Sequence, residues 1–440
     1  MKSYICTLGC KVNQYESGQM QALLEARGVT PAKKGEQVDI YIINSCTVTA
    51  TADQKTRQTL HKARREHPGA VVCLTGCMPQ AAADTIDKLD ADVILGTSNR
   101  NRIWECIERF LTTGQQVAEI APPADTFDDA VSIISNKTTK RTSAHERTRA
   151  YLKIEDGCDR FCSYCVIPHS RGRVRSRPLG SIRDEAAALA GRFRELVLVG
   201  INLSAYGQDA GLSLLDAVEA ASGPDGIVRL RLGSLEPDLL TGDMLGALAA
   251  NKKLCPQFHL SLQSGCDGTL RRMNRRYTTR EYASVVEKIR ALWDNPAITT
   301  DIMAGFPGET DGEFETSLNF VREIGFAKMH CFVYSRRPST AAADMPDQIP
   351  PETSSRRAAL MLEAAGEMEL NFMRGQIGRG EEVLVERHRD GFYHGYSRRY
   401  CPVRIAQTAP DEINPGEIIR VRITGVDEYG LLGEYHYETN

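Results

Sequence analysis

The chain has 440 residues, of which 42% are hydrophobic and 25% charged, and its formal net charge is −3. This length suits about three domains of roughly 150 residues each, and the weak negative charge excludes a general attraction to nucleic acid. No apolar run approaches the roughly 18 residues of a membrane helix, and the first residues lack a secretory signal, so a cytoplasmic protein without a membrane partner is expected. The 13 cysteines are an odd number, and cytoplasmic chains seldom form disulfides, so several are expected to bind metal.

Residues 1–120 alternate between short apolar runs and helical patterns. Apolar runs occupy 40–43 and 70–74, and helical patterns cover 14–27 and 52–66. This alternation predicts an N-terminal α/β domain in which helices cover a parallel sheet. Residues 121–148 begin with two prolines and continue without periodicity, which predicts a linker or loop.

Residues 149–373 repeat the strand–helix pattern at greater length. Strands are predicted at 151–154, 196–200, 228–232, 258–262, 299–303 and 329–334. Helices are predicted at 181–192, 239–250, 282–293, 313–324 and 351–373. Six units are too few for a closed eight-stranded barrel, so we expect a partial (β/α)6 barrel with its site at the carboxyl ends of the strands.

Residues 374–440 show a third pattern, of short strands and turns. Strands are predicted at 382–387, 391–396, 403–407 and 418–425. They indicate a small antiparallel β-barrel of the kind that often contacts RNA. Its acidic and basic residues nearly balance, so a packing module remains the alternative.

Three cysteines, Cys158, Cys162 and Cys165, follow the first strand of the predicted partial barrel. Thiolates separated by three and then two residues can hold one [4Fe-4S] cluster and leave its fourth iron free to bind a small molecule. A structural zinc site with His169 as fourth ligand is the alternative. Zinc ribbons usually pair two-residue gaps across a longer loop, so the spacing favours the cluster.

This spacing, with Tyr164 before the last cysteine, resembles the signature of radical S-adenosylmethionine enzymes. In that superfamily the open iron chelates the amino and carboxylate groups of S-adenosylmethionine, and one electron then frees a 5′-deoxyadenosyl radical. The resemblance implies an external electron donor and places Tyr164 at the cofactor. Four polar residues just past predicted strands are further candidates to bind S-adenosylmethionine, with a capping or turn role as the alternative for each: Asn202, Ser234, Glu236 and Gln263.

A second set of cysteines, Cys10, Cys46 and Cys77, closes three strand-like runs of the N-terminal region. Ligands of open parallel sheets bind beyond the carboxyl ends of the strands, so these thiols are expected to meet and to leave one iron of a cluster free. Gly9 and Gly76 would let the backbone turn tightly there. Simple burial is the alternative, and it is the expected role of the remaining cysteines: Cys6, Cys73, Cys106, Cys255, Cys266, Cys331 and Cys401.

Nearly the whole chain resembles the radical S-adenosylmethionine methylthiotransferases, most closely the branch that acts on N6-threonylcarbamoyladenosine in tRNA. The motifs that carry this resemblance lie at 7–17, 44–49, 75–77, 167–168, 261–266 and 334–336. Ser339 stands where the family pattern has glycine. The C-terminal β-barrel resembles the TRAM domain of that family.

The resemblance implies two [4Fe-4S] clusters and two uses of S-adenosylmethionine. Cys158, Cys162 and Cys165 would hold the cluster that generates the radical, and Cys10, Cys46 and Cys77 the auxiliary cluster that carries the sulfur. The implied substrate is tRNA, the implied product is 2-methylthio-N6-threonylcarbamoyladenosine beside the anticodon, and a monomer is expected.

Three alternative functions are also compatible with the sequence. Two are methylthiotransferases, acting on isopentenyladenosine in tRNA or on a ribosomal-protein aspartate. Lys11, Val12 and Asn13 after Cys10 speak against the second, whose pattern has Pro-Lys-Asn. The third is an RNA-binding protein with structural metal.

The reaction itself explains why no hydrolase-like site is evident. An unactivated aromatic C–H offers no acidic proton, so a cofactor-derived radical suits the chemistry better than acid–base catalysis. The threonylcarbamoyl group bears a carboxylate, which a guanidinium binds in bidentate fashion. Arg171, Arg173 and Arg336 are the expected substrate contacts.

Overall fold

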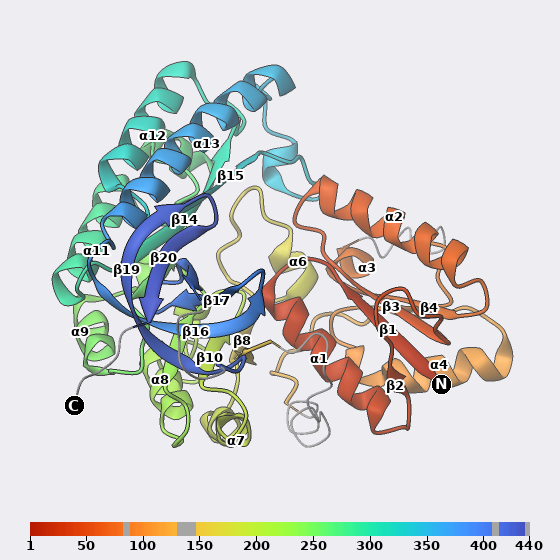
Figure 1. Cartoon of the computed structure of the whole chain (residues 1–440). Coiled ribbons are helices and arrows are strands. Elements are labelled where there is room, and N and C mark those ends of the chain that lie inside the picture. The colour runs from red at the N-terminus through yellow and green to blue at the C-terminus, as the bar shows by residue number, and fades with distance from the viewer. Residues whose placement is uncertain (82–88, 130–146, 407–412, 436–440) are drawn as a thin grey trace.

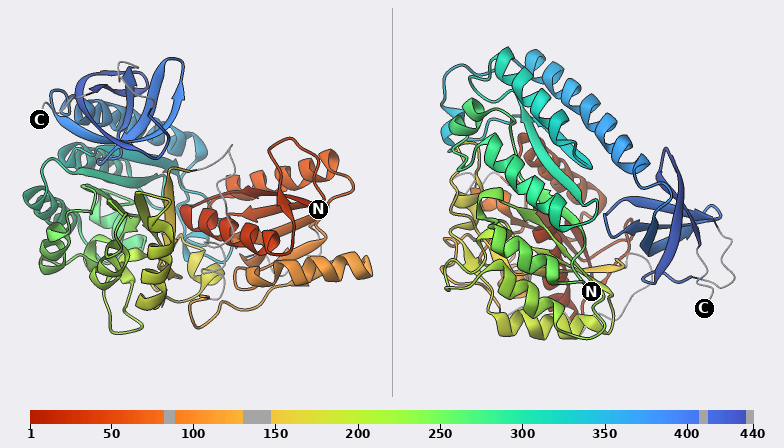
Figure 2. Two further views of the ribbon diagram at one scale, coloured as in Figure 1. Left: turned by 60° about the horizontal axis from the view of Figure 1, so that its bottom comes forward. Right: turned by 90° about the vertical axis from the view of Figure 1, so that its left-hand side faces the viewer.

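The computed structural model describes residues 1–81, 89–129, 147–406 and 413–435. Three units are visible in Figure 1: an N-terminal α/β unit in red and orange, a central core in yellow to cyan, and a C-terminal barrel in dark blue. The two views of Figure 2 show the N-terminal unit and the C-terminal barrel packed against different sides of the core. Among the described residues no helix is long and apolar enough to cross a membrane.

The N-terminal unit is built on a six-stranded sheet in which every pair is parallel, as predicted. In spatial order its strands are β2 (Thr30–Pro31), β1 (Lys2–Thr7), β3 (Ile40–Ser45), β4 (Val71–Gly76), β5 (Val93–Leu95) and β6 (Val117–Glu119). All residues of β3 and β4 are buried, because helices cover both faces of the sheet. These helices are α1 (Lys11–Glu25), α2 (Ala50–Glu66), α3 (Cys77–Ala81) and α4 (Ile103–Thr113).

The core is the partial barrel that the sequence predicts. Each of the six expected strands is present, with ends that differ from the prediction by at most two residues. They are β7 (Arg149–Lys153), β10 (Glu195–Val199), β11 (Arg229–Leu232), β13 (Gln257–Leu260), β14 (Ala297–Ala304) and β15 (Lys328–Val333). The hydrogen-bonded sheet breaks at Gly233, between β11 and the short β12 (Ser234–Leu235), and all its pairs are parallel.

Helices surround the outside of this barrel. They are α7 (Leu179–Ala190), α8 (Leu214–Ser222), α9 (Gly242–Ala250), α11 (Thr279–Leu292), α12 (Asp311–Ile324) and α13 (Pro351–Arg374). The prediction misses α8, and it starts α9 three residues early because the Thr241 side chain caps that helix by accepting from the Met244 amide. Capping boxes at Thr278 and Thr310 fix the starts of α11 and α12.

The C-terminal unit is a closed barrel of five strands, lying beside the end of α13 (Figure 2). The strands are β16 (Gly380–Arg389), β17 (Phe392–Ser397), β18 (Pro402–Ala406), β19 (Ile418–Asp427) and β20 (Gly430–Tyr435). The prediction lacks β20, and Gln407, the last residue of one predicted strand, lies outside the described residues. One pair also corrects the expectation of a purely antiparallel barrel, because β18 and β20 run parallel where the barrel closes.

The predicted linker at 121–148 falls largely outside the described residues. Its first part packs on the core: the Phe127 ring lies 5.5 Å from the Lys153 ammonium, and a Cβ on Gly172 would meet Pro123 at 2.5 Å. This segment therefore covers the junction between the N-terminal unit and the core.

Candidate cofactor and active site

The first cysteine set gathers at the carboxyl edge of the N-terminal sheet. Cys10 directly precedes α1, Cys46 follows β3, and Cys77 begins α3 directly after β4. Gly9 and Gly76 have φ angles of +98° and +100°, which L side chains rarely adopt. A Cβ on Gly9 would lie 2.6 Å from the Cys46 Cβ, so the glycine is required for the close approach of Cys10 to Cys46.

The three thiols share one electrostatic environment. Burial raises the pKa of Cys77 to about 11; Arg171 acts in the opposite direction, and Cys10 and Cys46 add to the increase. Cys77 and Cys46 are buried, whereas Cys10 is exposed. This set therefore opens to the outside of its unit at Cys10, which is where a reacting partner would approach.

The second cysteine set lies on the loop between β8 (Glu155–Asp156) and α6 (Ile167–Arg171). The Cys165 amide donates to the Cys162 carbonyl at 2.9 Å, which folds the loop back on itself. Burial raises the pKa of Cys165 to about 12, with Cys162 and Cys158 as further causes. The structure thus brings together the three thiols that the sequence predicts.

Two of the predicted S-adenosylmethionine contacts present unsatisfied polar atoms, and one of them, Asn202, lies beside this loop. Asn202 is buried; its Nδ2 lies 3.7 Å from the Cys158 sulfur, and its Oδ1 has no hydrogen-bond partner in the described structure. Gln263 is also buried with an unpartnered Oε1, and it holds a left-handed φ of +69°. Unsatisfied buried acceptors are costly, so they indicate a missing ligand with N–H or O–H groups.

Glu155 is a third group of this kind, and the sequence prediction misses it. Its Oε2 accepts from the Asn202 amide at 2.7 Å, and its Oε1 has no partner among the described residues. Burial raises the pKa of Glu155 to about 8. Its position directly after the predicted strand 151–154, which also precedes the cysteine loop, is the signal that could have identified it.

The other three predicted contacts are already engaged by protein. Ser234 shares a 3.0 Å hydrogen bond with Ser261. Glu236 accepts from Arg275 at 2.5 Å, and the same guanidinium donates to the Cys162 sulfur at 3.2 Å. The Tyr164 ring packs edge-on against Phe306 with centroids 6.4 Å apart. Glu236 therefore fixes the arginine that holds Cys162.

Both thiol sets fit an iron–sulfur cluster. Each offers three thiols from the part of the chain that the structure describes. A cubane binds each thiolate through a different iron, so its ligands stand farther apart than those around one ion. Within the described ranges no three His, Cys, Asp or Glu side chains lie close enough to hold a single metal ion. His169, the fourth ligand of the zinc alternative, is exposed and rests edge-on against Phe161.

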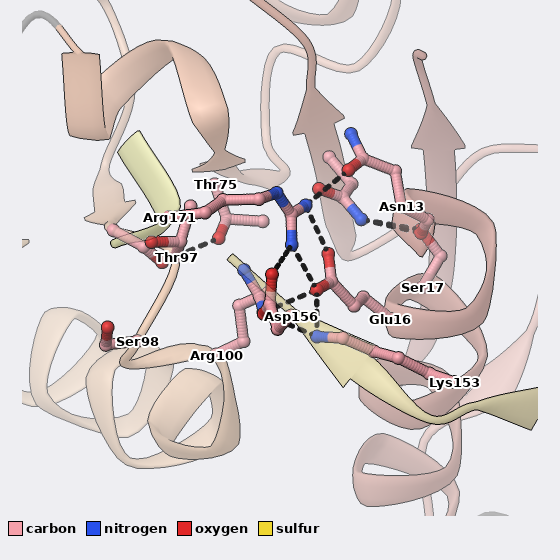
Figure 3. A network of polar contacts seen from close by, with 12 residues as sticks. Asn13, Glu16, Ser17, Thr75, Thr97, Ser98, Arg100, Lys153, Asp156 and Arg171 are labelled. Atoms are coloured by element: carbon pink, nitrogen blue, oxygen red, sulfur yellow. Dashed lines mark hydrogen bonds and ion pairs between the residues drawn. The ribbon is translucent and has the colours of Figure 1, made fainter. Parts of the chain in front are cut away.

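A buried ionic network joins the two sets (Figure 3). The Arg171 guanidinium, 0% exposed, donates to Glu16 at 2.9 and 3.0 Å, to Asp156 at 3.0 Å and to Asn13 at 2.8 Å. Lys153 donates to the same two carboxylates, at 2.8 and 2.7 Å. The prediction of Arg171 as a substrate contact is therefore wrong, because protein groups enclose its guanidinium.

Asn13 carries this network into the first cysteine set. Its Nδ2 donates to the carbonyls of Leu8 and Ser45, both at 2.8 Å, and these residues lie two and one positions before the end-of-strand cysteines. Its Oδ1 accepts from Arg171. On the other side Asp156 lies two residues before Cys158, and its Oδ1 accepts from the Gly157 amide at 2.9 Å. The network therefore fixes the two cysteine-bearing loops relative to each other.

The other two predicted substrate contacts are exposed. Arg173, 73% exposed, pairs with Asp159 at 3.2 Å and stacks 4.8 Å from the Phe161 ring, on the surface of the second cysteine loop. Arg336 is exposed and forms no hydrogen bond or ion pair with any described residue. Its neighbour Arg337, by contrast, is buried and donates to Thr47 and Asp53 at 2.8 and 2.5 Å.

The tight turn at Gly76 provides a test of the first cysteine set. A Cβ there would lie 2.5 Å from the Ser45 carbonyl oxygen, in addition to the strain of a left-handed φ. Gly76→Ala should destabilise the protein by about 1–3 kcal/mol and lower its iron content, measured by thermal unfolding and iron analysis. Gly18→Ala in α1, where a Cβ meets nothing within 4 Å, is the control and should be neutral or stabilising. Equal behaviour of the two variants would contradict the role given to Gly76.

Comparison with known proteins places this geometry in a class. Residues 2–96 match the family described as "Uncharacterized protein family UPF0004", and residues 152–321 match the radical SAM superfamily. A solved structure of similar fold is the radical S-adenosylmethionine methyltransferase TsrM of Kitasatospora setae, with a TM-score of 0.56. The two chains are 13% identical, and the match covers 89% of this chain and 77% of the other. At this identity the similarity shows a shared fold and says nothing about function. The chain is a radical S-adenosylmethionine enzyme and as such uses a [4Fe-4S] cluster and S-adenosylmethionine.

Full-length relatives narrow the class to a family. A tRNA-2-methylthio-N(6)-dimethylallyladenosine synthase of Pelotomaculum thermopropionicum is 36% identical, over 100% of this chain and 99% of the relative. The threonylcarbamoyladenosine tRNA methylthiotransferase MtaB of Thermotoga maritima is 34% identical, over 97% of this chain and 95% of the relative. The protein belongs to the radical S-adenosylmethionine methylthiotransferases.

Proposed function

We propose that this enzyme inserts a methylthio group at carbon 2 of N6-threonylcarbamoyladenosine, next to the anticodon of tRNA. The single observation that carries this choice of substrate is the exposed, unpaired guanidinium of Arg336. Its neighbours are anchored on the segment that follows Cys46: Ser335 accepts from the Ala50 amide at 2.9 Å, and Arg337 donates to Asp53. Arg336 therefore presents a cation beside the first cysteine set, where an anionic substrate would be recognised.

Each cysteine set is proposed to hold one [4Fe-4S] cluster. Cys158, Cys162 and Cys165 would hold the cluster at which S-adenosylmethionine binds, with Asn202, Gln263 and the other strand-end residues around its polar groups. Cys10, Cys46 and Cys77 would hold the auxiliary cluster. When bound, these groups supply the radical and the sulfur.

The protein's own residues then have three tasks. Asn202 and Gln263 offer acceptors to an amino or hydroxyl group, Arg275 holds the Cys162 sulfur, and the Arg171 network fixes the second site relative to the first. Arg173 on the second cysteine loop is proposed to contact phosphates of tRNA, which position a nucleic acid without reading its bases. Arg336, on the loop after β15, is proposed to contact anionic groups of the same substrate.

Methylthiolation of isopentenyladenosine is the second candidate, because the relative from Pelotomaculum bears the name of that activity. The two candidates are separated by anaerobic reconstitution with S-adenosylmethionine, a reductant and tRNA, followed by mass spectrometry of the nucleosides. The proposal predicts 2-methylthio-N6-threonylcarbamoyladenosine. Formation of 2-methylthio-isopentenyladenosine without the threonylcarbamoyl product would overturn the choice of substrate.

Arg336→Ala should weaken tRNA binding without changing the cofactor sites, because its guanidinium forms no hydrogen bond or ion pair with a described residue. Loss of one exposed cation at a phosphate contact should lower affinity by roughly 5- to 10-fold at low salt and less at high salt, measured by filter binding. Arg322→Ala on the exposed face of α12 is the control, and it should change little. Unchanged affinity in the Arg336 variant would exclude Arg336 as a tRNA contact.

A further inference from the structure

A cavity of about 290 Å³ lies where all three units of the chain meet. Lys11 of α1 enters it from the N-terminal unit, His259 and His330 line it from the core strands β13 and β15, and Tyr396 and Tyr400 close it from the C-terminal barrel. Lys11 directly follows Cys10, so the cavity begins one residue from the first cysteine set. This volume is at the lower end of small-molecule sites, which run from roughly 300 to 1,000 Å³. It suits a substituent of a base better than a whole nucleotide.

The charged side chains that line this cavity are paired, with one exception. Lys328 pairs with Glu369 at 3.2 Å, and Arg399 pairs with Glu381 of the C-terminal barrel. Lys11 forms no hydrogen bond or ion pair with any residue that the structure describes. Its ammonium group is therefore free to bind an anion that enters the cavity.

The arginines that act on Lys11 are themselves paired, since Arg149 and Arg231 bind Glu195 at 3.4 and 3.2 Å. Arg149 and Arg231, which act on Lys11 electrostatically, lie over the Tyr400 ring at 4.9 and 4.6 Å. Asp301 and the Cys10 thiol act on Lys11 in the opposite direction, and Asp301 is bound by His259 at 3.2 Å. The cavity therefore presents one unpaired ammonium among charged groups that are otherwise paired, and it favours a small anionic group.

We propose that this cavity receives the N6 substituent of the target adenosine and that Lys11 binds its carboxylate. This assignment rests on the proposed function and goes further, since it names the residue that distinguishes a carboxylate-bearing base from an apolar one. Lys11 lines a cavity that three units form, whereas Arg336 lies on the loop that follows β15. Arg336 favours an anionic substrate in general, and Lys11 at the cavity makes the charge-assisted contact with the carboxylate itself.

Binding of anticodon stem-loops tests the assignment. Three otherwise identical RNAs carry N6-threonylcarbamoyladenosine, isopentenyladenosine or unmodified adenosine at the target position, and their dissociation constants are measured with iron-loaded and with iron-free protein. Lys11→Met keeps the length of the side chain and removes its charge. It should reduce the preference for the threonylcarbamoyl RNA over the unmodified RNA by about 10- to 100-fold, as expected for one hydrogen bond to a charged group.

Two further variants keep the result interpretable. Lys11→Arg keeps the charge and should keep most of the preference, and Lys328→Met, in the same cavity but paired with Glu369, should change it by less than about threefold. An unchanged preference in Lys11→Met would overturn the assignment. Equal weakening of all three RNAs would also overturn it, because it would show a structural role. A wild-type preference for the isopentenyl RNA would instead overturn the proposed function, whatever the variants do.

Discussion

The Cys10→Ala enzyme is expected to lose methylthio transfer altogether while it continues to convert S-adenosylmethionine to 5′-deoxyadenosine. The reason is that the two thiol sets lie on separate units of the chain, at the edge of the N-terminal sheet and on the loop after β8. Removing one thiol of the first set leaves the second set and its Arg275 contact intact. The measurement is liquid chromatography with mass spectrometry of 5′-deoxyadenosine and of modified nucleosides in the same reaction.

The reciprocal variant and a matched control make this result specific. Cys158→Ala should abolish both products, because radical formation precedes transfer. Cys73→Ala removes a fully buried thiol four residues before Cys77 and should retain both activities at reduced stability. Loss of 5′-deoxyadenosine formation in Cys10→Ala would contradict the assignment of separate tasks to the two sets.

The Arg171→Met protein is expected to be less stable by about 3–5 kcal/mol. The substitution removes the guanidinium from a buried ion-pair network and leaves the carboxylates of Glu16 and Asp156 without that partner. Glu16 and Asp156 would keep Lys153 but lose the guanidinium that joins them across the two units. The effect is measured by chemical unfolding of the iron-free protein. In the iron-loaded enzyme the ratio of methylthio product to 5′-deoxyadenosine should also fall, because the two sites are no longer held in register.

Arg357→Met is the matched control for Arg171. Arg357 is also buried and pairs with Glu309 and Asp311, but it lies within the core. Its loss should destabilise the protein to a similar extent without changing the product ratio. A normal ratio in Arg171→Met would exclude a positioning role and leave only a structural one.

The same network predicts that the stability of the folded protein depends on pH. Burial alone would raise the pKa of Glu16, but Arg100, Arg171 and Lys153 together lower it to about 2 from an ordinary value of 4.5. A depressed carboxyl pKa contributes stability above pH 4.5 that is lost as the pH falls toward 2. In Arg171→Met the pKa of Glu16 should rise, so the difference in stability between wild type and variant should shrink as the pH falls through this range.

Local patterns in the sequence predicted most of the fold and both cysteine sets. Strand and helix periodicity is a local property, and the spacing of Cys158, Cys162 and Cys165 lies within one loop, so neither depends on distant partners. The strand-end rule also pointed to Asn202 and Gln263, which are buried and whose side-chain oxygens have no hydrogen-bond partner among the described residues. It did not find β20, whose parallel partner β18 follows from barrel closure.

The arginine run at 171–177 is a case in which a local sequence pattern gave a wrong prediction for Arg171. Alternating arginines after the cysteine loop suggested contacts with an anionic substrate, yet Arg171 binds Glu16, which lies 155 residues away in sequence. Lys11 is the opposite case, since nothing in its neighbourhood in the sequence indicates that it enters a cavity with residues from near 259, 330 and 400. In both cases packing between units, which periodicity does not encode, decides whether a cation is paired.

Iron and sulfide analysis tests the central claim most directly, namely that the chain holds two clusters on two sets of three thiols. The anaerobically purified protein should contain about eight irons and eight sulfides per chain, and the variant with alanine at Cys10, Cys46 and Cys77 about four of each. About four irons in both proteins, or zinc in place of iron, would contradict the account.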